Sequence, residues 1–547
     1  MTWLKNNPIV LIFLAGISIF LFHLNVIPVT IMEARNFVTA REMITDGNWL
    51  LTTMNELPRY EKPPLPSWIT ALFGSVFGLE NIAGLRLPTM LMAIFLGYIG
   101  YLFSLKILDN KLHALINALI LLSSFYIIVI TIEAPWDIYT HGFMLTAIYF
   151  LYSFFDHPEN KWKNSLLAGL FIGLSFMSKG PVSLYALLLP FLLAYGFVFK
   201  YKGFGAYKKY IPLVVMILLA MVIGLWWFLY VRLADPNAFL AITKKETANW
   251  SSYNVRPFYY YWSFFIQSGI WTIPALISLI YPYLKNKVSD KKAYRLSFLW
   301  TIFSVILLSI IPEKKARYLV PVLIPLALNT GFYMEYVIRK FKSSFVQKEK
   351  IPVYFHFSLL GLIGIAYPII AYLLLKDGLS GLWMYYALSS LTLFAIGVLL
   401  FVQLKKQQLF GCFLLSIALI GAIKLLAMPL SGAMEKNTEY KSISQLRKVM
   451  QEEGLKTYCF GEIAPEMIWD YGSAIPVLKG EEEIQIPNGE KFGVLVIPSD
   501  ENEFKRIFDP EYSYTLNTVY DLNHNANPGT KGHKNRLISN LYIVQKR

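Results

Sequence analysis

Long apolar runs separated by short polar loops fill the first 430 residues. A run of about 20 apolar residues is long enough to cross a bilayer as a helix. Two of the runs, 140–155 and 164–178, are short for a span. The pattern predicts about thirteen membrane helices, near 8–30, 84–105, 113–131, 140–155, 164–178, 182–199, 211–233, 259–283, 295–311, 318–338, 353–375, 383–403 and 409–428.

The pattern changes after residue 430. Short apolar and aromatic runs that are typical of strands appear there, as in TYCFGEI, FGVLVIPS, SYTLNTVY and NLYIVQK. APEMIWDYG and DENEFKRIF have helical character. We therefore predict a transmembrane domain over 1–429 and a small α/β domain over 430–547.

The charge of the loops predicts the orientation. Loops such as KILDNK, LKNKVSDKKAYR and RKFKSSFVQKEK are rich in lysine and arginine, and they alternate with loops that carry fewer. The positive-inside rule places the basic loops and the N-terminus in the cytoplasm. An odd number of spans then places the C-terminal domain outside, with long external loops at 31–83 and 234–258. The loop charges thus predict a multi-pass membrane protein with an external C-terminal domain.

Composition agrees with a membrane protein, because 56% of residues are hydrophobic and only 16% are charged. The net charge of +15 does not indicate nucleic-acid binding, since the basic clusters adjoin predicted spans. The two cysteines, Cys412 in an apolar run and Cys459 in the tail, form no disulfide framework.

Several cations lie in the predicted external loops, where the charge bias would place few. Lys62 stands in RYEKPPLPSW, where two following prolines keep its backbone extended. Lys179 lies in SKGPVS and Arg256 in NVRPFYYYWSFF. A shared anionic ligand at headgroup depth, such as a phosphate attached to a lipid, explains this grouping. The alternative for Lys62 is an ordinary lysine whose ammonium reaches the interface.

Acids also lie at the predicted outer surface. The stretch from Glu33 to Met43 has helical character and ends at TDGNW, so it predicts a helix along the membrane surface. Asp137 lies in the short loop TIEAPWDIYTH. Such acids are either solvated or line a functional cavity. Aromatic residues 258–262 belong either to an interfacial belt or to a groove for a lipid chain.

These stretches together resemble the bacterial GT-C glycosyltransferases. The resemblance is strongest to the lipid A aminoarabinose transferases and to the dolichyl-phosphate-mannose–protein mannosyltransferase-like enzymes. It covers most of residues 1–330. It is carried by MEARNFVTAREM, GNW, RYEKPPLPSWITALFG and GLRLPTML, and by Asp137, Lys179-Gly180-Pro181, Arg256 to Tyr261 and Tyr318 to Pro321.

The resemblance implies transfer of a sugar from a polyprenyl-phosphate donor, such as undecaprenyl phosphate, to lipid A or a protein on the periplasmic face. One displacement would invert the anomeric centre. The implied ligands of the donor phosphate are Lys62, Arg35, Arg256 and Lys179. The family also associates the glutamate before the lysine, here Glu61, with a divalent metal ion.

The sequence departs from the family pattern at one important position. Met32 stands where the family has its first acid, and Asn36 replaces the usual tyrosine. Either Glu33 or Asp137 takes the catalytic role, or the donor–acceptor pair differs from that of the family's type members, or the protein is a catalytically altered member that has lost activity. The alternative from another class is a transporter or flippase of lipid-linked sugars. Such a protein would show two similar halves and charges at mid-depth rather than at one face.

Overall fold

The structure is a computed structural model that describes residues 7–156, 159–201, 210–434, 437–480 and 484–547. The chain divides into two compact units. Unit 1 comprises residues 1–26, 60–66 and 86–433, and unit 2 comprises 27–59, 67–85 and 434–547. The predicted boundary near 430 falls at the end of unit 1, but most of the predicted loop 31–83 belongs to the same unit as the tail.

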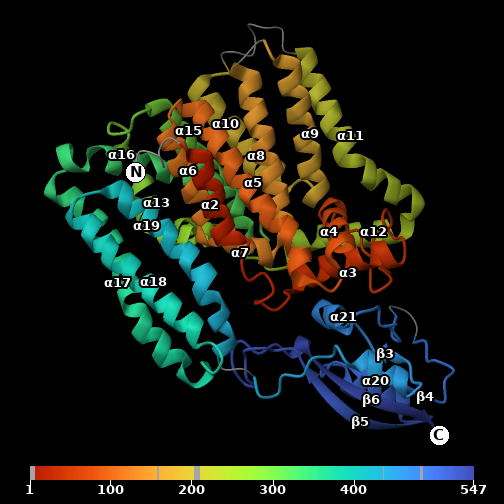
Figure 1. The fold of residues 1–547 in the computed structure, drawn as a ribbon. Coiled ribbons are helices and arrows are strands. Elements are labelled where there is room, and N and C mark those ends of the chain that lie inside the picture. The colour runs from red at the N-terminus through yellow and green to blue at the C-terminus, as the bar shows by residue number, and fades with distance from the viewer. Residues whose placement is uncertain (1–6, 157–158, 202–209, 435–436, 481–483) are drawn as a thin grey trace. The chain divides into compact units, whose positions relative to one another are not determined.

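Unit 1 is helical (Figure 1). Its helices, of which α5 begins in unit 2, are α2 (Pro8–Phe20), α5 (Ile82–Leu108), α6 (Lys111–Ser123), α7 (Phe125–Glu133), α8 (Pro135–Asp156), α9 (Lys161–Lys179), α10 (Leu189–Phe199), α11 (Tyr210–Ala234), α12 (Pro236–Ser252), α13 (Thr272–Ser278), α14 (Tyr281–Leu284), α15 (Lys291–Ile310), α16 (Val320–Ser344), α17 (Gln347–Leu375), α18 (Trp383–Lys405) and α19 (Leu409–Ala422).

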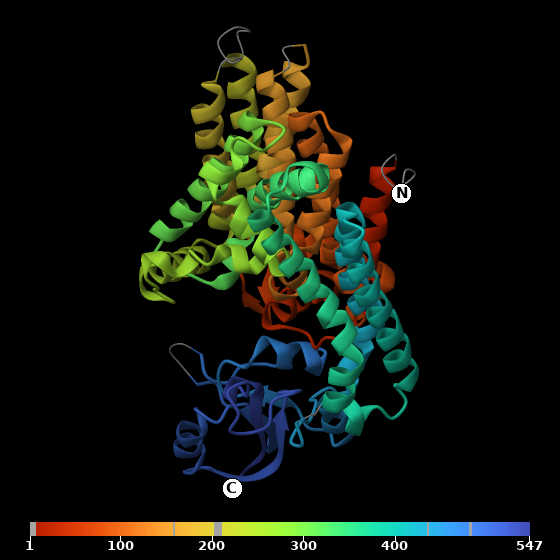
Figure 2. The ribbon, with the colours of Figure 1, turned by 90° about the vertical axis from the view of Figure 1, so that its left-hand side faces the viewer.

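Helices α8, α9 and α11 lie side by side in unit 1 (Figure 1). Gly169 allows the close approach of α9 to α11, because a Cβ there would lie 2.6 Å from the backbone oxygen of Met216. Helices α17 and α18 form a second pair, drawn in green to cyan in Figure 2. A Cβ on Gly364 would meet the backbone oxygen of Leu393 at 2.6 Å, so glycine again permits backbone contact.

Among the described residues, seven helices are long and apolar enough to cross a membrane, and the bent pair α6 and α7 makes an eighth if counted as one span. The prediction of a polytopic helical protein is confirmed, but the predicted number of thirteen spans is not. Several apolar stretches form helices of only 10–17 residues, among them α2, which ends at Phe20 rather than at residue 30.

The predicted span 259–283 is not one helix. It consists of 3₁₀ turns at Phe258–Tyr261 and Phe264–Trp271, followed by the short helices α13 and α14. Gly269 has a φ of +68°, which an α-helix does not accommodate. The apolar run therefore does not form a continuous helix, and several of its large side chains, such as Tyr259 and Ile266, are exposed.

Unit 2 combines the first-loop helix α3 (Ile31–Thr45), the hairpin of β1 (Thr53–Met54) and β2 (Leu57–Pro58), and most of α4 (Leu65–Phe77) with the tail. The tail contains α20 (Leu446–Glu452), β3 (Thr457–Cys459), α21 (Pro465–Tyr471), β4 (Lys491–Val496), α22 (Glu501–Phe508), β5 (Tyr512–Asp521) and β6 (Ile538–Lys546). The predicted α/β fold of the tail is confirmed.

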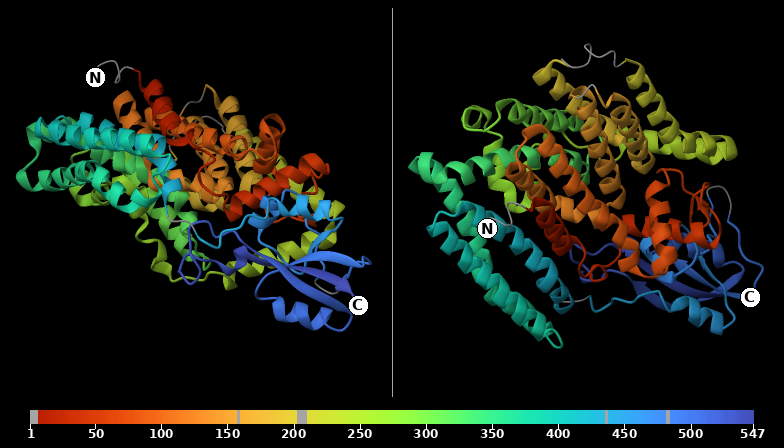
Figure 3. Two further views of the ribbon diagram at one scale, coloured as in Figure 1. Left: turned by 60° about the horizontal axis from the view of Figure 1, so that its bottom comes forward. Right: turned by 45° about the horizontal axis from the view of Figure 1, so that its top comes forward.

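The tail strands form a four-stranded sheet in the order β3-β4-β6-β5, drawn in blue in Figure 3. Strands β3 and β4 are parallel, and the other pairs are antiparallel. Successive side chains of β4 point to opposite faces: Val494 packs with Phe504 and Phe508 of α22, and Leu495 packs with Leu446 and Met450 of α20. The sheet is therefore covered by helices on both faces.

Candidate active site

Helix α3 carries the predicted catalytic Glu33 and the predicted phosphate ligand Arg35. It begins with a capping box, in which the Glu33 N–H donates to Thr30 Oγ1 at 3.4 Å and the Thr30 N–H donates to Glu33 Oε2 at 3.1 Å. A capping box satisfies two N–H groups that the first helical turn leaves unpaired. The Glu33 side chain, with its residue 1% exposed, therefore also fixes the start of the helix.

Arg35 and Asn36, the next polar residues of α3, differ in their hydrogen bonds. The Nε of Arg35 is buried, and no described residue accepts a hydrogen bond from it. Asn36 donates to Thr70 Oγ1 and accepts from Ser67 Oγ, both at 2.7 Å. Asn36, where the resemblance expects tyrosine, thus ties α3 to α4 within unit 2.

The proline-framed segment around Lys62 is attached to residues 235–246 of unit 1, in the loop predicted over 234–258. The Tyr60 hydroxyl donates to Asp235 Oδ2 at 2.9 Å, and the Lys62 ammonium pairs with Glu246 Oε2 at 3.1 Å. Pro63 and Pro64 are buried, which holds the backbone beside Lys62. Sequence reasoning missed Glu246, because no pattern connects residues that are 184 positions apart.

Glu61 is the residue that the resemblance associates with a divalent metal ion. It is exposed, and the part of the chain that the structure describes contains no group of three or more His, Cys, Asp or Glu residues that would hold a metal ion. A metal site needs several converging ligands. The role of Glu61 as a metal ligand therefore stays a prediction.

Asp137 and Lys179 meet in the interior of unit 1. Asp137 lies in the first turn of α8 and Lys179 in the last turn of α9. Lys179 Nζ donates to Asp137 Oδ1, and the two side chains are 9% and 1% exposed. His141 Nε2, one turn along α8, lies 3.8 Å from the same oxygen. The second Asp137 oxygen is buried without a hydrogen-bond partner among the described residues.

Three cations surround the ring of Tyr318. The distances to the ring centroid are 5.1 Å from Lys179 Nζ, 5.6 Å from Lys315 Nζ and 5.9 Å from Arg317 Cζ. Cations at such distances are attracted by the face of an aromatic ring. The Tyr318 hydroxyl donates to Glu313 Oε1 at 3.2 Å, and Glu313 also pairs with Lys315 at 2.5 Å. Burial is the main cause that raises the pKa of Tyr318, with the Glu313 charge adding to it.

Arg256 lies on a loop that pairs with the loop before Tyr318. Val255 and Glu313 form an antiparallel bridge, and the Arg256 N–H donates to the Pro312 oxygen at 3.2 Å. The buried Lys314 ammonium donates to the backbone oxygens of Arg256 and Ile311 at 3.1 and 2.6 Å. The exposed Arg256 guanidinium is thus held on a fixed backbone.

The structure brings part of the predicted set together. The charges of Asp137, Arg317 and Lys62 all act on the Lys179 ammonium. Three predicted residues therefore share one region of unit 1. Glu33 and Arg35 belong to unit 2. The assigned roles of these residues remain predictions.

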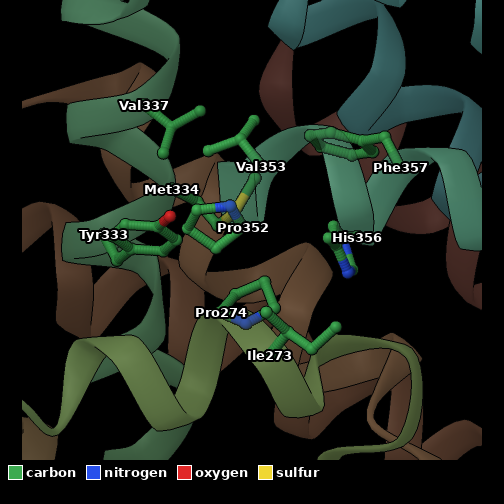
Figure 4. A pocket seen from close by; sticks show the side chains of 9 residues that line it. All are labelled: Ile273, Pro274, Tyr333, Met334, Val337, Pro352, Val353, His356 and Phe357. Carbon is green, nitrogen blue, oxygen red and sulfur yellow. The ribbon is translucent and has the colours of Figure 1, made fainter. Parts of the chain in front are cut away.

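A pocket elsewhere in unit 1 contains none of the predicted residues. Figure 4 shows its largely apolar lining, which is formed by Ile273, Pro274, Tyr333, Met334, Val337, Pro352, Val353, His356 and Phe357. We therefore do not treat it as the active site.

Comparison with known proteins supports the resemblance. The family model of dolichyl-phosphate-mannose-protein mannosyltransferases matches residues 61–227, a range that includes Lys62, Asp137 and Lys179. The undecaprenyl phosphate-alpha-4-amino-4-deoxy-L-arabinose arabinosyl transferase of Pseudomonas savastanoi pv. phaseolicola is 24% identical over 304 residues, or 54% of this chain and 55% of that protein. The enzyme of the same name from Wigglesworthia glossinidia brevipalpis is 31% identical over 31% of this chain and 30% of its own. The chain thus spans about half the length of the curated relatives it matches, or less.

The likeness in structure is more extensive. ArnT from Cupriavidus metallidurans, solved bound to undecaprenyl phosphate, superposes with a TM-score of 0.67 at 16% identity, covering 98% of this chain and 97% of that one. The same protein in its apo state gives a TM-score of 0.66. These comparisons confirm the resemblance to the dolichyl-phosphate-mannose-protein mannosyltransferases and the aminoarabinose transferases, and they show that this chain has the GT-C fold of ArnT.

Proposed function

We propose that this chain is a membrane glycosyltransferase that moves a sugar from an undecaprenyl-phosphate donor to an envelope acceptor. The observation that carries the proposal is the buried pair of Lys179 and Asp137 in unit 1, the unit that also contains Lys62. All three lie in the range that matches the family model. The related ArnT, which has the same fold, binds undecaprenyl phosphate.

The cations act on the leaving phosphate. In the transfer, the bond between the anomeric carbon and the phosphate oxygen breaks, and its electron pair stays on the phosphate. Cations already aimed at that group stabilise the charge as it develops. Lys62, Lys179 and Arg256 supply these charges from unit 1.

A carboxylate receives the acceptor's proton. The acceptor oxygen forms its bond to the anomeric carbon on the face opposite the departing phosphate, so the configuration inverts. If the acceptor is a hydroxyl, its proton passes to Glu33 or Asp137. Both residues are 1% exposed. If the acceptor is a phosphate of lipid A, no such proton has to be removed.

The orientation predicted by the basic loops belongs to the same proposal. It places the N-terminus in the cytoplasm and the C-terminal domain in the periplasm, where lipid A and envelope proteins are accessible. The protein would then act in the bacterial inner membrane on the periplasmic side. Residues 434–547, which share unit 2 with α3, are suited to influence which acceptor is used.

The test uses the purified full chain in lipid nanodiscs. It is incubated with undecaprenyl phosphate-4-amino-4-deoxy-L-arabinose and lipid A, and the release of undecaprenyl phosphate is followed by mass spectrometry. We expect release that depends on the acceptor and falls about tenfold or more in Lys62→Gln, because a charge-assisted contact to phosphate is lost. A transporter would release none.

Two variants measured side by side identify the base. Glu33→Gln and Asp137→Asn each remove a carboxylate with little change in shape. The base is the residue whose variant loses about 100-fold or more in turnover while donor affinity is kept. Equal and small losses in both would exclude both assignments.

A further inference from the structure

Two acids in the loop predicted over 234–258 hold the segment that carries Lys62. Asp235 accepts from the Tyr60 hydroxyl at 2.9 Å and also caps α12 by accepting from the Ala238 N–H at 3.3 Å. Glu246, farther along the same helix, accepts from the Lys62 ammonium at 3.1 Å. Both contacts lie within unit 1, and both place a carboxylate beside a residue of the proline-framed segment.

The two contacts differ in how easily they are broken. The Tyr60 residue is 5% exposed, and its ring packs edge-on against Trp227 with centroids 6.3 Å apart. The side chains of Lys62 and Glu246 are 27% and 38% exposed, and one contact joins them. Exposed pairs of this kind contribute little to stability because water competes for both charges. The backbone of the segment is therefore anchored, while the Lys62 ammonium is held weakly.

Glu246 also has the wrong charge for a phosphate site. A carboxylate that stayed paired with Lys62 would neutralise that cation and repel an arriving anion. The buried pair of Lys179 and Asp137 offers a contrast, because there the partner is enclosed and cannot leave cheaply. Among the ion pairs of the described residues, only the Lys62 pair combines an exposed anion with a cation proposed to bind the donor.

We propose that Glu246 is the exchangeable counter-ion of Lys62, displaced by the phosphate of the donor when the donor binds. This inference rests on the proposed function. The pair lowers the affinity of Lys62 for any single anion, including ordinary phospholipid headgroups. Tight binding then requires a ligand that also reaches the other cations, such as Lys179. Glu246 is in this way a specificity-determining residue that does not touch the bound donor.

The experiment measures binding of undecaprenyl phosphate to the full chain in nanodiscs of zwitterionic lipid. Wild type is compared with Glu246→Gln, Lys62→Gln and the double variant. We expect Glu246→Gln to bind about two- to fivefold more tightly, which is the range for an exposed ion pair. Lys62→Gln should bind more weakly, and adding Glu246→Gln to it should change nothing further.

A second readout separates competition from a structural role. Glu246→Gln should be inhibited by added anionic phospholipid at lower concentration than wild type, because Lys62 is then available to any headgroup. The matched control is Glu452→Gln, which removes an exposed carboxylate 4.0 Å from Lys448 in the tail. This control should bind undecaprenyl phosphate as wild type does.

The outcomes distinguish the two proposals. If Lys62→Gln weakens binding but Glu246→Gln leaves it unchanged or weakens it, Glu246 holds Lys62 in place and the counter-ion proposal is wrong. The proposed function then stands. If Lys62→Gln binds as wild type does, Lys62 is not a donor ligand and both proposals lose their basis.

Discussion

Residues 31–59 and residues 60–66 of the predicted first loop are built in opposite ways. In residues 31–59, Glu42 is 3% exposed and accepts from Thr53 Oγ1 at 2.6 Å and from the Asn55 and Glu56 N–H groups at 2.7 and 3.3 Å. In residues 60–66, Lys62 has one partner and a 27% exposed side chain. The Glu42 carboxylate is therefore enclosed, and the Lys62 ammonium is at the surface.

The comparison separates the buried Glu42 hydrogen bonds, which fix the local structure, from the exposed Lys62 ion pair, which can change its partner. A buried acceptor with several donors is costly to disturb, because removing it leaves each donor unsatisfied. An exposed ion pair is cheap to break. Glu42 therefore holds the shape of the hairpin, whereas the Lys62 charge can exchange its partner. The variants below test this contrast, beginning with the largest expected effect on stability.

Asp137→Asn tests a third arrangement, the buried ion pair. The substitution leaves the enclosed Lys179 charge without its counter-ion, so we expect a loss of about 3–5 kcal/mol in the free energy of unfolding. Thermal unfolding of the purified protein measures it. Replacing both residues with apolar ones, Asp137→Leu with Lys179→Met, should recover much of the loss. A single variant as stable as wild type would mean that the pair is not enclosed.

Glu42→Ala should destabilise unit 2 by about 3 kcal/mol, because the hairpin loses the acceptor of two backbone N–H groups and one hydroxyl. Burial is the largest cause that raises the pKa of Glu42, and these hydrogen bonds act against it. Protease sensitivity of the 48–59 segment, compared with thermal unfolding, is the measurement. Glu56→Gln, which alters an exposed side chain in the same turn, should have no effect.

Asn55→Gly should cost about 1–2 kcal/mol. Asn55 has a φ of +59°, which glycine adopts without strain, so the variant removes the amide and keeps the turn. The lost contacts are Nδ2 to the Ile475 oxygen at 2.8 Å and Oδ1 from the Ile475 N–H at 2.7 Å. Asn254→Gly is the control, since Asn254 has a φ of +50° and its side chain makes no hydrogen bond in the described part of the chain. Equal effects of the two variants would assign the cost to the backbone.

Lys62→Gln should change the free energy of unfolding by less than about 0.5 kcal/mol, because it removes only an exposed pair. The same variant should nevertheless weaken undecaprenyl phosphate binding about tenfold. Calorimetry and a binding isotherm on one preparation give both numbers. A large loss of stability would mean that Lys62 has a structural role like that of Glu42, and the contrast between residues 31–59 and 60–66 would be wrong.

Local patterns in the sequence predicted much of the fold. The helix expected over 33–43 is α3, because the glutamate at its third position and Gly47 beyond its end mark its limits. The four tail strands and the helices α21 and α22 form at the predicted stretches. Successive strand residues point to opposite faces, and because helices cover both faces of the sheet, apolar residues are buried on each. Helix α20 and the hairpin at 53–58 were not predicted, because they are short and take their stability from tertiary contacts.

The site was less accessible to prediction. Sequence reasoning selected Lys62, Asp137 and Lys179. It did not predict that Lys179 bonds Asp137 or that Lys62 pairs with Glu246. These contacts join positions 42 and 184 residues apart, and only folding brings them together. The predicted span at 259–283 was wrong for a different reason, because the hydrophobicity of a run does not report the backbone angles of Gly269.

The hairpin tip has a consequence for how the tail can diverge. Asn55 recognises residue 475 through its main-chain N–H and oxygen and not through its side chain. The identity of residue 475 can therefore drift among amino acids that fit its surroundings without loss of this attachment. Proline would remove one of the two hydrogen bonds, since it has no N–H to offer. Homologous tails with little recognisable similarity can in this way keep one mode of anchorage.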